Sequence, residues 1–300
     1  MIARTRRPAL ALALGVLVLG ALPACAQDAE VRRYVRYEAQ GEVSYGLLEG
    51  DQIRQLDGGF LSNPEPTGLT VALSAVRLLS PVDPDRTSKV IGVAVNTRRP
   101  SRMEPIPNPR WFAKFPTSLG GMDSEVQLPP EAGNLNYEGE LVLIIGREAR
   151  HVSEAEALDY VFGVTVGDDF SENTWYGERN GVDDPTRMIS KGTDSWAPIG
   201  PAIVTGLDYT DLAVETRLNG EVVQAGRTSD LVNGVASLIS HVSRYITLKP
   251  GDVIFTGTVL FVEGARRAMQ AGDVVEVEIE NLGVLRNRIV PMMSSGGSQP

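Results

Sequence analysis

The 300-residue sequence is poor in the residue types that build several common active sites. Cys25 is its only cysteine, and it lies close to the N-terminus, outside any folded domain that the sequence predicts. The folded protein therefore has no intrachain disulfide, no cysteine nucleophile and no zinc–thiolate cluster. His151 and His241 are the only histidines, which excludes a metal centre built from three imidazoles.

Basic residues are also few, since 28 lysines and arginines stand against 38 aspartates and glutamates, for a net charge of −10. A chain of this charge is not expected to bind nucleic acid or an anionic membrane by electrostatic attraction. Its length and its 42% content of hydrophobic residues are sufficient for one large core and a small additional domain.

The first 26 residues have the pattern of an export leader. Arg4, Arg6 and Arg7 precede the apolar stretch 9–22, which is too short to span a membrane comfortably. Two interpretations of the C-terminal end of this leader stay open. Cleavage after Ala26 would release a soluble protein, whereas Cys25 as the first residue of a lipoprotein would carry a lipid anchor. Either reading predicts an exported protein, periplasmic or anchored to a membrane.

Two carboxylates, Glu138 and Glu140, stand at the start of the apolar run 141–145. In a strand, residues i and i+2 project from the same face about 7 Å apart, so both side chains can bind one hard cation. Mg²⁺ is the first choice and Mn²⁺ or Ca²⁺ the alternatives. Taken alone, the pair also fits an exposed strand start with two solvated acids.

A second β-branched run, 161–167, is followed by Asp168 and Asp169. Two strands with carboxylates at one end of a sheet would supply three oxygen ligands and leave other positions for water or a chelating substrate. We therefore predict Asp169 as the third metal ligand, beside Glu138 and Glu140.

Four ordered segments resemble motifs of the fumarylacetoacetate hydrolase family. They are Y-E-G-E-L from Tyr137, D-D-F-S from Asp168, K-G-T-D-S-W-A-P-I-G-P from Lys191 and P-G-D-V-I-F-T-G-T from Pro250. The resemblance runs from about Lys89 to Val290, and four motifs in order are far more specific than any one of them.

The resemblance implies an α+β, β-rich fold, a mixed β-sheet roll preceded by a small N-terminal β domain. We place the N-terminal domain at 27–80, the catalytic domain at 89–291 and a disordered tail at 292–300. Local patterns predict strands at 31–37, 43–48 and 52–56, and a hairpin turn at Asn219-Gly220. They also predict a helix over 230–245 and a short helix that begins at the capping box Ser153–Glu156.

The resemblance further implies a divalent-metal-dependent enzyme that cleaves a carbon–carbon bond of a small 2-oxo or β-diketo carboxylic acid through a metal-bound enolate. Lys191 would stabilise the enolate, Thr258 would contact the substrate carboxylate, and Gly257 beside it would let the backbone approach the substrate closely. Lys114, in an imperfect copy of a family segment, is interpreted as scaffolding. A homodimer is the family's usual assembly.

The sequence departs from the family where hydrolysis needs a base. Pro100 stands in place of the family's water-activating histidine, which leaves Glu104 as the candidate base. Arg98, with Arg99 and Arg102 in the same loop, would bind a second substrate carboxylate.

The family's S-A-R-D arginine is missing too, because Ser171 is followed by Glu172 and Asn173. Decarboxylation or keto–enol isomerisation would need the metal but no activated water, and these reactions stay open beside hydrolysis. An exported protein that binds a metal or ligand without turnover is the alternative from another class.

Overall fold

The computed structural model describes residues 30–99, 103–104, 107–176 and 184–292. The predicted fold class is confirmed, because mixed β-sheets dominate and helices are few. The leader 1–26, with Cys25, and the tail beyond residue 292 lie outside the described residues. Within the described part of the chain, no helix is long and apolar enough to cross a membrane.

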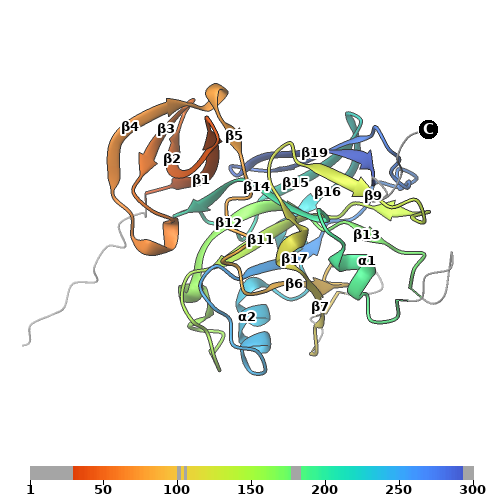
Figure 1. The fold of residues 1–300 in the computed structure, drawn as a ribbon. Coiled ribbons are helices and arrows are strands. Elements are labelled where there is room, and N and C mark those ends of the chain that lie inside the picture. Colours follow the sequence, from red (N-terminus) through yellow and green to blue (C-terminus); the bar gives the residue numbers. More distant parts are fainter. Residues whose placement is uncertain (1–29, 100–102, 105–106, 177–183, 293–300) are drawn as a thin grey trace, which may run out of the picture.

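The largest sheet has the strand order β4-β3-β2-β1-β14-β12-β11-β17-β6-β7, with β5 paired to β1 and β8 to β14 (Figure 1). Its strands are β1 (Arg32–Ala39), β2 (Glu42–Glu49), β3 (Gln52–Leu56), β4 (Pro66–Ala72), β5 (Arg77–Leu78), β6 (Val90–Ala94), β7 (Arg110–Lys114), β8 (Leu119–Gly120), β11 (Gly139–Ile145), β12 (Val161–Asp168), β14 (Ala197–Thr205) and β17 (Val253–Thr258).

The N-terminal strands belong to this same sheet. The strands predicted at 31–37, 43–48 and 52–56 are present as β1, β2 and β3. β1 pairs antiparallel with β14, with Tyr34 opposite Ile203. In Figure 1 these strands form a lobe at one side of the molecule, yet hydrogen bonds run without a break across the predicted domain boundary.

Strand β11 lies at the centre of the sheet and is buried along its whole length. Its side chains alternate between two cores: Leu141, Leu143 and Ile145 pack into one, and Val142 and Ile144 into the other. A strand with apolar residues on both faces is typical of the interior of a layered fold. Burial on both faces fixes the register of β11 and, with it, the position of the residues at its start.

A second sheet has the order β16-β15-β18-β19-β9 and packs beside the first. Its strands are β9 (Glu125–Leu128), β15 (Ala213–Leu218), β16 (Glu221–Arg227), β18 (Val274–Ile279) and β19 (Gly283–Pro291), and β10 (Leu135–Asn136) pairs with β13 (Ser171–Glu172) apart from both sheets. The predicted turn at Asn219-Gly220 joins β15 to β16, and both residues have positive φ, as a type I′ turn requires.

Two helix predictions need correction. Helix α2 spans Val235–Ser243 rather than 230–245, because residues 228–230 form a 3₁₀ turn and the N-cap Gly234 has extended backbone. No α-helix begins at the Ser153 capping box. The Ser153 hydroxyl bonds the Glu156 carboxylate itself at 2.6 Å, and a 3₁₀ helix, Ala157–Tyr160, follows. The other α-helix in the described structure is α1 (Met188–Gly192), which carries Lys191.

Candidate metal and substrate site

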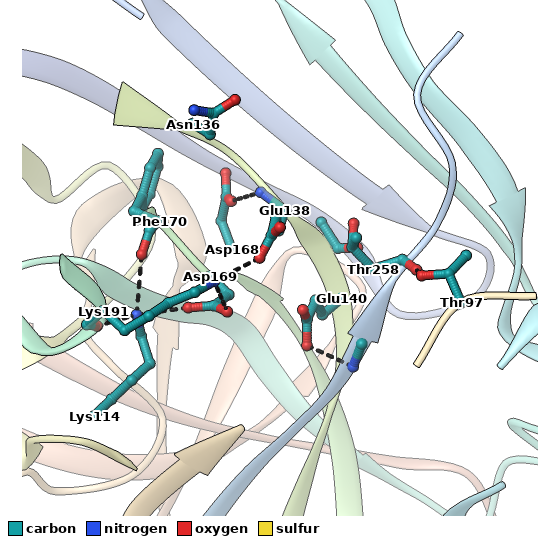
Figure 2. A network of polar contacts seen from close by, with 12 residues as sticks. Thr97, Lys114, Asn136, Glu138, Glu140, Asp168, Asp169, Phe170, Lys191 and Thr258 are labelled. Carbon is teal, nitrogen blue, oxygen red and sulfur yellow. Dashed lines mark hydrogen bonds and ion pairs between the residues drawn. The ribbon is translucent and has the colours of Figure 1, made fainter. Parts of the chain in front are cut away.

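Three strand ends converge at one point of the large sheet (Figure 2). β11 and β12 run antiparallel with Gly139 opposite Asp168, so the start of β11 lies beside the end of β12. The amide of Asp169 donates to the Glu138 carbonyl at 2.9 Å. The end of β17 joins them, because Thr258 lies opposite Glu140.

The three predicted metal ligands are brought together at this point. Glu138, Glu140 and Asp169 each offer a carboxylate oxygen, and the three oxygens lie within 4.8 Å of one another. Glu140 and Asp169 are buried, whereas the Glu138 side chain keeps 24% of its exposure. Burial, and then the charges of Asp169 and Glu138, raise the pKa of Glu140 well above its ordinary value.

This donor set fits a hard divalent cation. Carboxylate oxygens are the ligands that Mg²⁺, Mn²⁺ and Ca²⁺ prefer, and three negative groups confined to a buried point repel one another unless positive charge lies between them. Glu138, Glu140 and Asp169 would therefore hold the ion.

Two lysines supply positive charge to the cluster. Lys191, 2% exposed, places its Nζ 2.6 Å from Glu138 Oε2 and forms a shorter ion pair with Asp169. Burial opposes its charge, but Asp169 and Glu138 outweigh that effect and raise the pKa of Lys191 above its ordinary value. The sequence predicted Lys191 at this site, and the structure places it on α1.

Lys114 was interpreted as scaffolding, yet it contacts the cluster directly. Its side chain is completely buried, and its Nζ lies 2.6 Å from Asp169 Oδ1 and 3.2 Å from the Phe170 carbonyl. Burial would raise the pKa of Asp169, but the ammonium groups of Lys114 and Lys191 lower it below the ordinary value. The family-like segment around Lys114 was the signal, obscured by the extra residue Phe115.

Asp168 lies behind the predicted ligands and was not predicted as part of the site. Its Oδ1 accepts the amide proton of Glu138 at 2.7 Å, and its Oδ2 has no hydrogen-bond partner among the residues that the structure describes. Burial raises the pKa of Asp168 to about 7. Its contact with the Glu138 backbone helps to fix the start of β11.

Gly257 holds Glu140 in place. Its amide donates to Glu140 Oε2 at 2.7 Å. Its φ of +112° favours glycine, and a Cβ atom there would approach the Cβ of Asn96 to 2.9 Å. The sequence predicted Gly257 as a point of close backbone approach, and its observed neighbours are Glu140 and Asn96.

A network that the sequence did not reveal fixes the hydroxyl of Thr258. Gly139 N–H donates to Gln224 Oε1 at 3.1 Å, so Gln224 Nε2 faces Thr258 and donates to its Oγ1 at 3.0 Å. The hydroxyl in turn donates to the Gly139 carbonyl at 3.0 Å. A substrate carboxylate, which only accepts, therefore receives no hydrogen bond from the Thr258 hydroxyl in this arrangement.

A cavity of about 560 Å³ opens onto the site, lined by Glu138, Glu140, Lys191, Gly257 and Thr258. Four arginines also line it: Arg99, Arg110, Arg187 and Arg266. The structure thus brings five of the predicted site residues into the lining of one cavity, and Asp169 contacts this group through its ion pair with Lys191.

Arg98 and Glu104 do not join this group. The Arg98 guanidinium turns to the carbonyls of Met103 and Leu231, each at 3.4 Å, and neither Arg98 nor Glu104 lines the cavity. Arg99, the residue after Arg98, does line the cavity. Pro100 and Arg102 lie outside the described residues.

Neither His151 nor His241 lines the cavity. His241 lies on α2, where its Nδ1 accepts the indole proton of Trp111 at 3.1 Å, and His151 is exposed in a loop. Among the described residues, the cavity therefore has no imidazole that could activate water.

The fold and site together define a class: a β-rich protein with a carboxylate cluster suited to a divalent cation and a buried lysine beside it. The family model described as "Fumarylacetoacetate (FAA) hydrolase C-terminal" matches residues 89–290, and the chain belongs to this family. A second model, "Rv2993c-like, N-terminal", matches residues 32–81.

Relatives within the family carry different activities in their names. The human protein named oxaloacetate tautomerase FAHD2A, mitochondrial, is 38% identical over 226 residues, which cover 72% of this chain and 70% of the human one. A crystal structure of 5-carboxymethyl-2-hydroxymuconate delta-isomerase from Mycobacterium smegmatis is 34% identical, with a TM-score of 0.78 over 87% of this chain and 100% of its own. Maleylpyruvate hydrolase from Sphingobium is 25% identical, with a TM-score of 0.70 over 87% and 100%.

Proposed function

We propose that the protein is a divalent-metal-dependent enzyme that interconverts the keto and enol forms of a small 2-oxo carboxylic acid. The observation that carries this proposal is the ammonium group of Lys191, held at the carboxylate cluster in a cavity without histidine among its described walls. The tautomerase and isomerase named among the relatives support it.

The proposed reaction requires few functional groups. Keto–enol interconversion moves one proton between carbon and oxygen, breaks no carbon–carbon bond and consumes no water. A cation bound by Glu138, Glu140 and Asp169 would act as a Lewis acid toward the oxygens of the 2-oxo acid. Lys191 would stabilise the negative charge that develops on substrate oxygen through a charged hydrogen bond.

Glu138 and Asp169 orient this lysine, since its Nζ contacts both carboxylates. Gly257 N–H holds Glu140 in a fixed position, and Lys114 offsets part of the charge of Asp169 from the buried side. The site is thus held in place before substrate arrives, which is the condition for electrostatic catalysis.

The experiment follows the enol absorbance of freshly dissolved oxaloacetate with Mg²⁺ or Mn²⁺, against an EDTA control. Pyruvate formation and cleavage of an acylpyruvate are measured in the same preparation. We expect metal-dependent interconversion without pyruvate. Pyruvate would indicate a decarboxylase, and acylpyruvate cleavage would favour hydrolytic carbon–carbon cleavage, the family's default. Metal binding without any turnover would favour a binding protein.

Export and homodimer formation are further proposals, the first resting on the leader pattern of residues 1–26 and the second on the family resemblance. Intact mass of the secreted protein distinguishes cleavage after Ala26 from lipidation of Cys25, because a diacylglyceryl group adds a large and defined mass. Light scattering on the purified protein measures the mass of the assembly.

A further inference from the structure

We propose that Arg187 binds a second carboxylate of the substrate, so that the preferred substrates are 2-oxo dicarboxylic acids. This inference rests on the proposed function and names its substrate class. The sequence assigned this task to the loop of Arg98, Arg99 and Arg102, whereas the structure offers a group on another element.

Arg187 lies next to the lysine of the site. It directly precedes α1, and the Lys191 amide donates to the Arg187 carbonyl at 3.2 Å, so the two residues are one turn apart. Both line the cavity onto which Glu138 and Glu140 open. A small substrate held at the cluster beside Lys191 would therefore have Arg187 within the same cavity.

The Arg187 guanidinium has no counter-charge among the described residues. It is half-buried, its Cζ lies 5.1 Å from the centre of the Tyr176 ring, and no hydrogen bond or ion pair engages it within the part of the chain that the structure describes. By contrast, a salt bridge to a carboxylate engages each of three other arginines, Arg217, Arg227 and Arg286. A partly desolvated guanidinium is stabilised by an anion, and a carboxylate matches its paired donors.

The backbone of Arg187 is held in an uncommon conformation. Its φ is +60°, in the left-handed region, and the residue is not glycine. The neighbouring Asp184 fixes this turn, because its carboxylate accepts the amide protons of Met188, Ile189 and Ser190 at 2.7–3.0 Å. The turn therefore presents Arg187 and Lys191 together.

The other arginines of the cavity fit the task less well. Arg99, Arg110 and Arg266 are exposed, and Arg266 already donates from its Nε to Asn136 Oδ1 at 3.1 Å. Asn173, at the position of the arginine in the family's S-A-R-D motif, lines the cavity as a neutral residue. Arg187 is the half-buried cation of the four.

The test compares two stable ligands of equal chain length, malate and 2-hydroxybutyrate, by calorimetric titration of the Mg²⁺-loaded enzyme. They differ only in the second carboxylate, which is a methyl group in 2-hydroxybutyrate. We expect the wild type to bind malate at least about tenfold more tightly, and Arg187→Met to weaken malate by about 10- to 100-fold while 2-hydroxybutyrate is unchanged. Arg187→Lys should keep part of the preference.

Arg147→Met is the matched control, because Arg147 also lies over a tyrosine, Tyr160, at 4.8 Å, but does not line the cavity. It should leave both affinities unchanged. The proposal would be overturned if the wild type bound both ligands equally, if the malate preference survived in Arg187→Met, or if Arg187→Met weakened the binding of both ligands to the same extent. If Arg187→Met does not fold, full retention of the malate preference in Arg187→Lys would overturn it.

Because neither ligand is turned over, the titration gives its answer independently of whether the enzyme tautomerises oxaloacetate.

Discussion

At the scale of single residues, we propose two roles for Lys191 that can be separated by experiment. Its ammonium is proposed to act on the substrate, and it also occupies the space between Glu138 and Asp169. Lys191→Met should lower kcat by about 10²- to 10³-fold, as removal of one charged donor from a preorganised site does. It should leave Mg²⁺ affinity equal or higher, because a competing cation has been removed.

Calorimetric titration with Mg²⁺, together with the kcat of the same sample, measures both effects. Loss of Mg²⁺ binding in Lys191→Met would contradict the separate roles. Lys89→Met is the control, because Lys89 also pairs with a buried carboxylate, Asp252 at 2.7 Å, but lies outside the cavity.

The network of Gln224 gives a second prediction at this scale. Gln224 accepts from the Gly139 amide and donates to the Thr258 hydroxyl, so Gln224→Leu removes the acceptor of the buried amide and the donor to the hydroxyl, which keeps only its bond to the Gly139 carbonyl. Removing such a partner costs about 1–3 kcal/mol per group. We expect a lower free energy of unfolding and a weaker affinity for substrate, measured by urea denaturation and by KM. Unchanged stability would show that the network does not hold the start of β11.

At the scale of elements, helix α1 depends on Asp184. This residue accepts three amide protons from the first turn of α1, as an N-terminal cap does, although it precedes the helix by several residues. Asp184→Ala should destabilise the protein by about 0.5–2 kcal/mol and reduce kcat, because α1 carries Lys191. Thermal denaturation and kinetics measure these effects, and a kcat equal to that of the wild type would contradict a positioning role.

The contact between α2 and β7 should respond to pH. His241 Nδ1 accepts a proton from the Trp111 indole, so it must be unprotonated there. Burial, and then Arg244, lower the pKa of His241 below 6.5. The unfolded chain therefore takes up the proton first as pH falls, and this contribution to stability is present above about pH 6.5 and lost below it.

Urea denaturation at a series of pH values tests this sign. The wild type should lose stability between about pH 6.5 and 5 more steeply than His241→Gln, whose side chain does not titrate. Parallel curves for the two proteins would contradict the assignment.

The elements also show what could be predicted from the sequence. Glu138, Glu140 and Asp169 were predictable because strand alternation and motif order are local properties, and the buried run 141–145 fixes their register. The bounds of α2 could not be predicted, because the apolar spacing from residue 231 onward did not reveal that Gly234 has extended backbone. Gln224, Asp184 and Arg187 escaped prediction because their roles depend on distant strands or on a local backbone angle.

At the scale of the whole molecule, the continuity of the large sheet predicts cooperative unfolding. β1 pairs with β14, and Val35, Tyr37 and Ile53 share a core with Ala202 of β14. Removal of residues 30–80 would expose the edge of β14 and this apolar surface. We expect one denaturation transition for the full chain and an aggregating fragment for 82–292. Two separate transitions, or a soluble and active fragment, would contradict this view.

We propose that Glu138, Glu140 and Asp169 hold a divalent cation that the reaction requires. The most direct measurement is a titration of metal-free protein with Mn²⁺, run beside the oxaloacetate assay, for the wild type and Glu140→Ala. We predict one ion per chain and metal-dependent turnover in the wild type, and the loss of both in the variant. Full metal binding or full activity in Glu140→Ala would show that these three carboxylates are not the metal site.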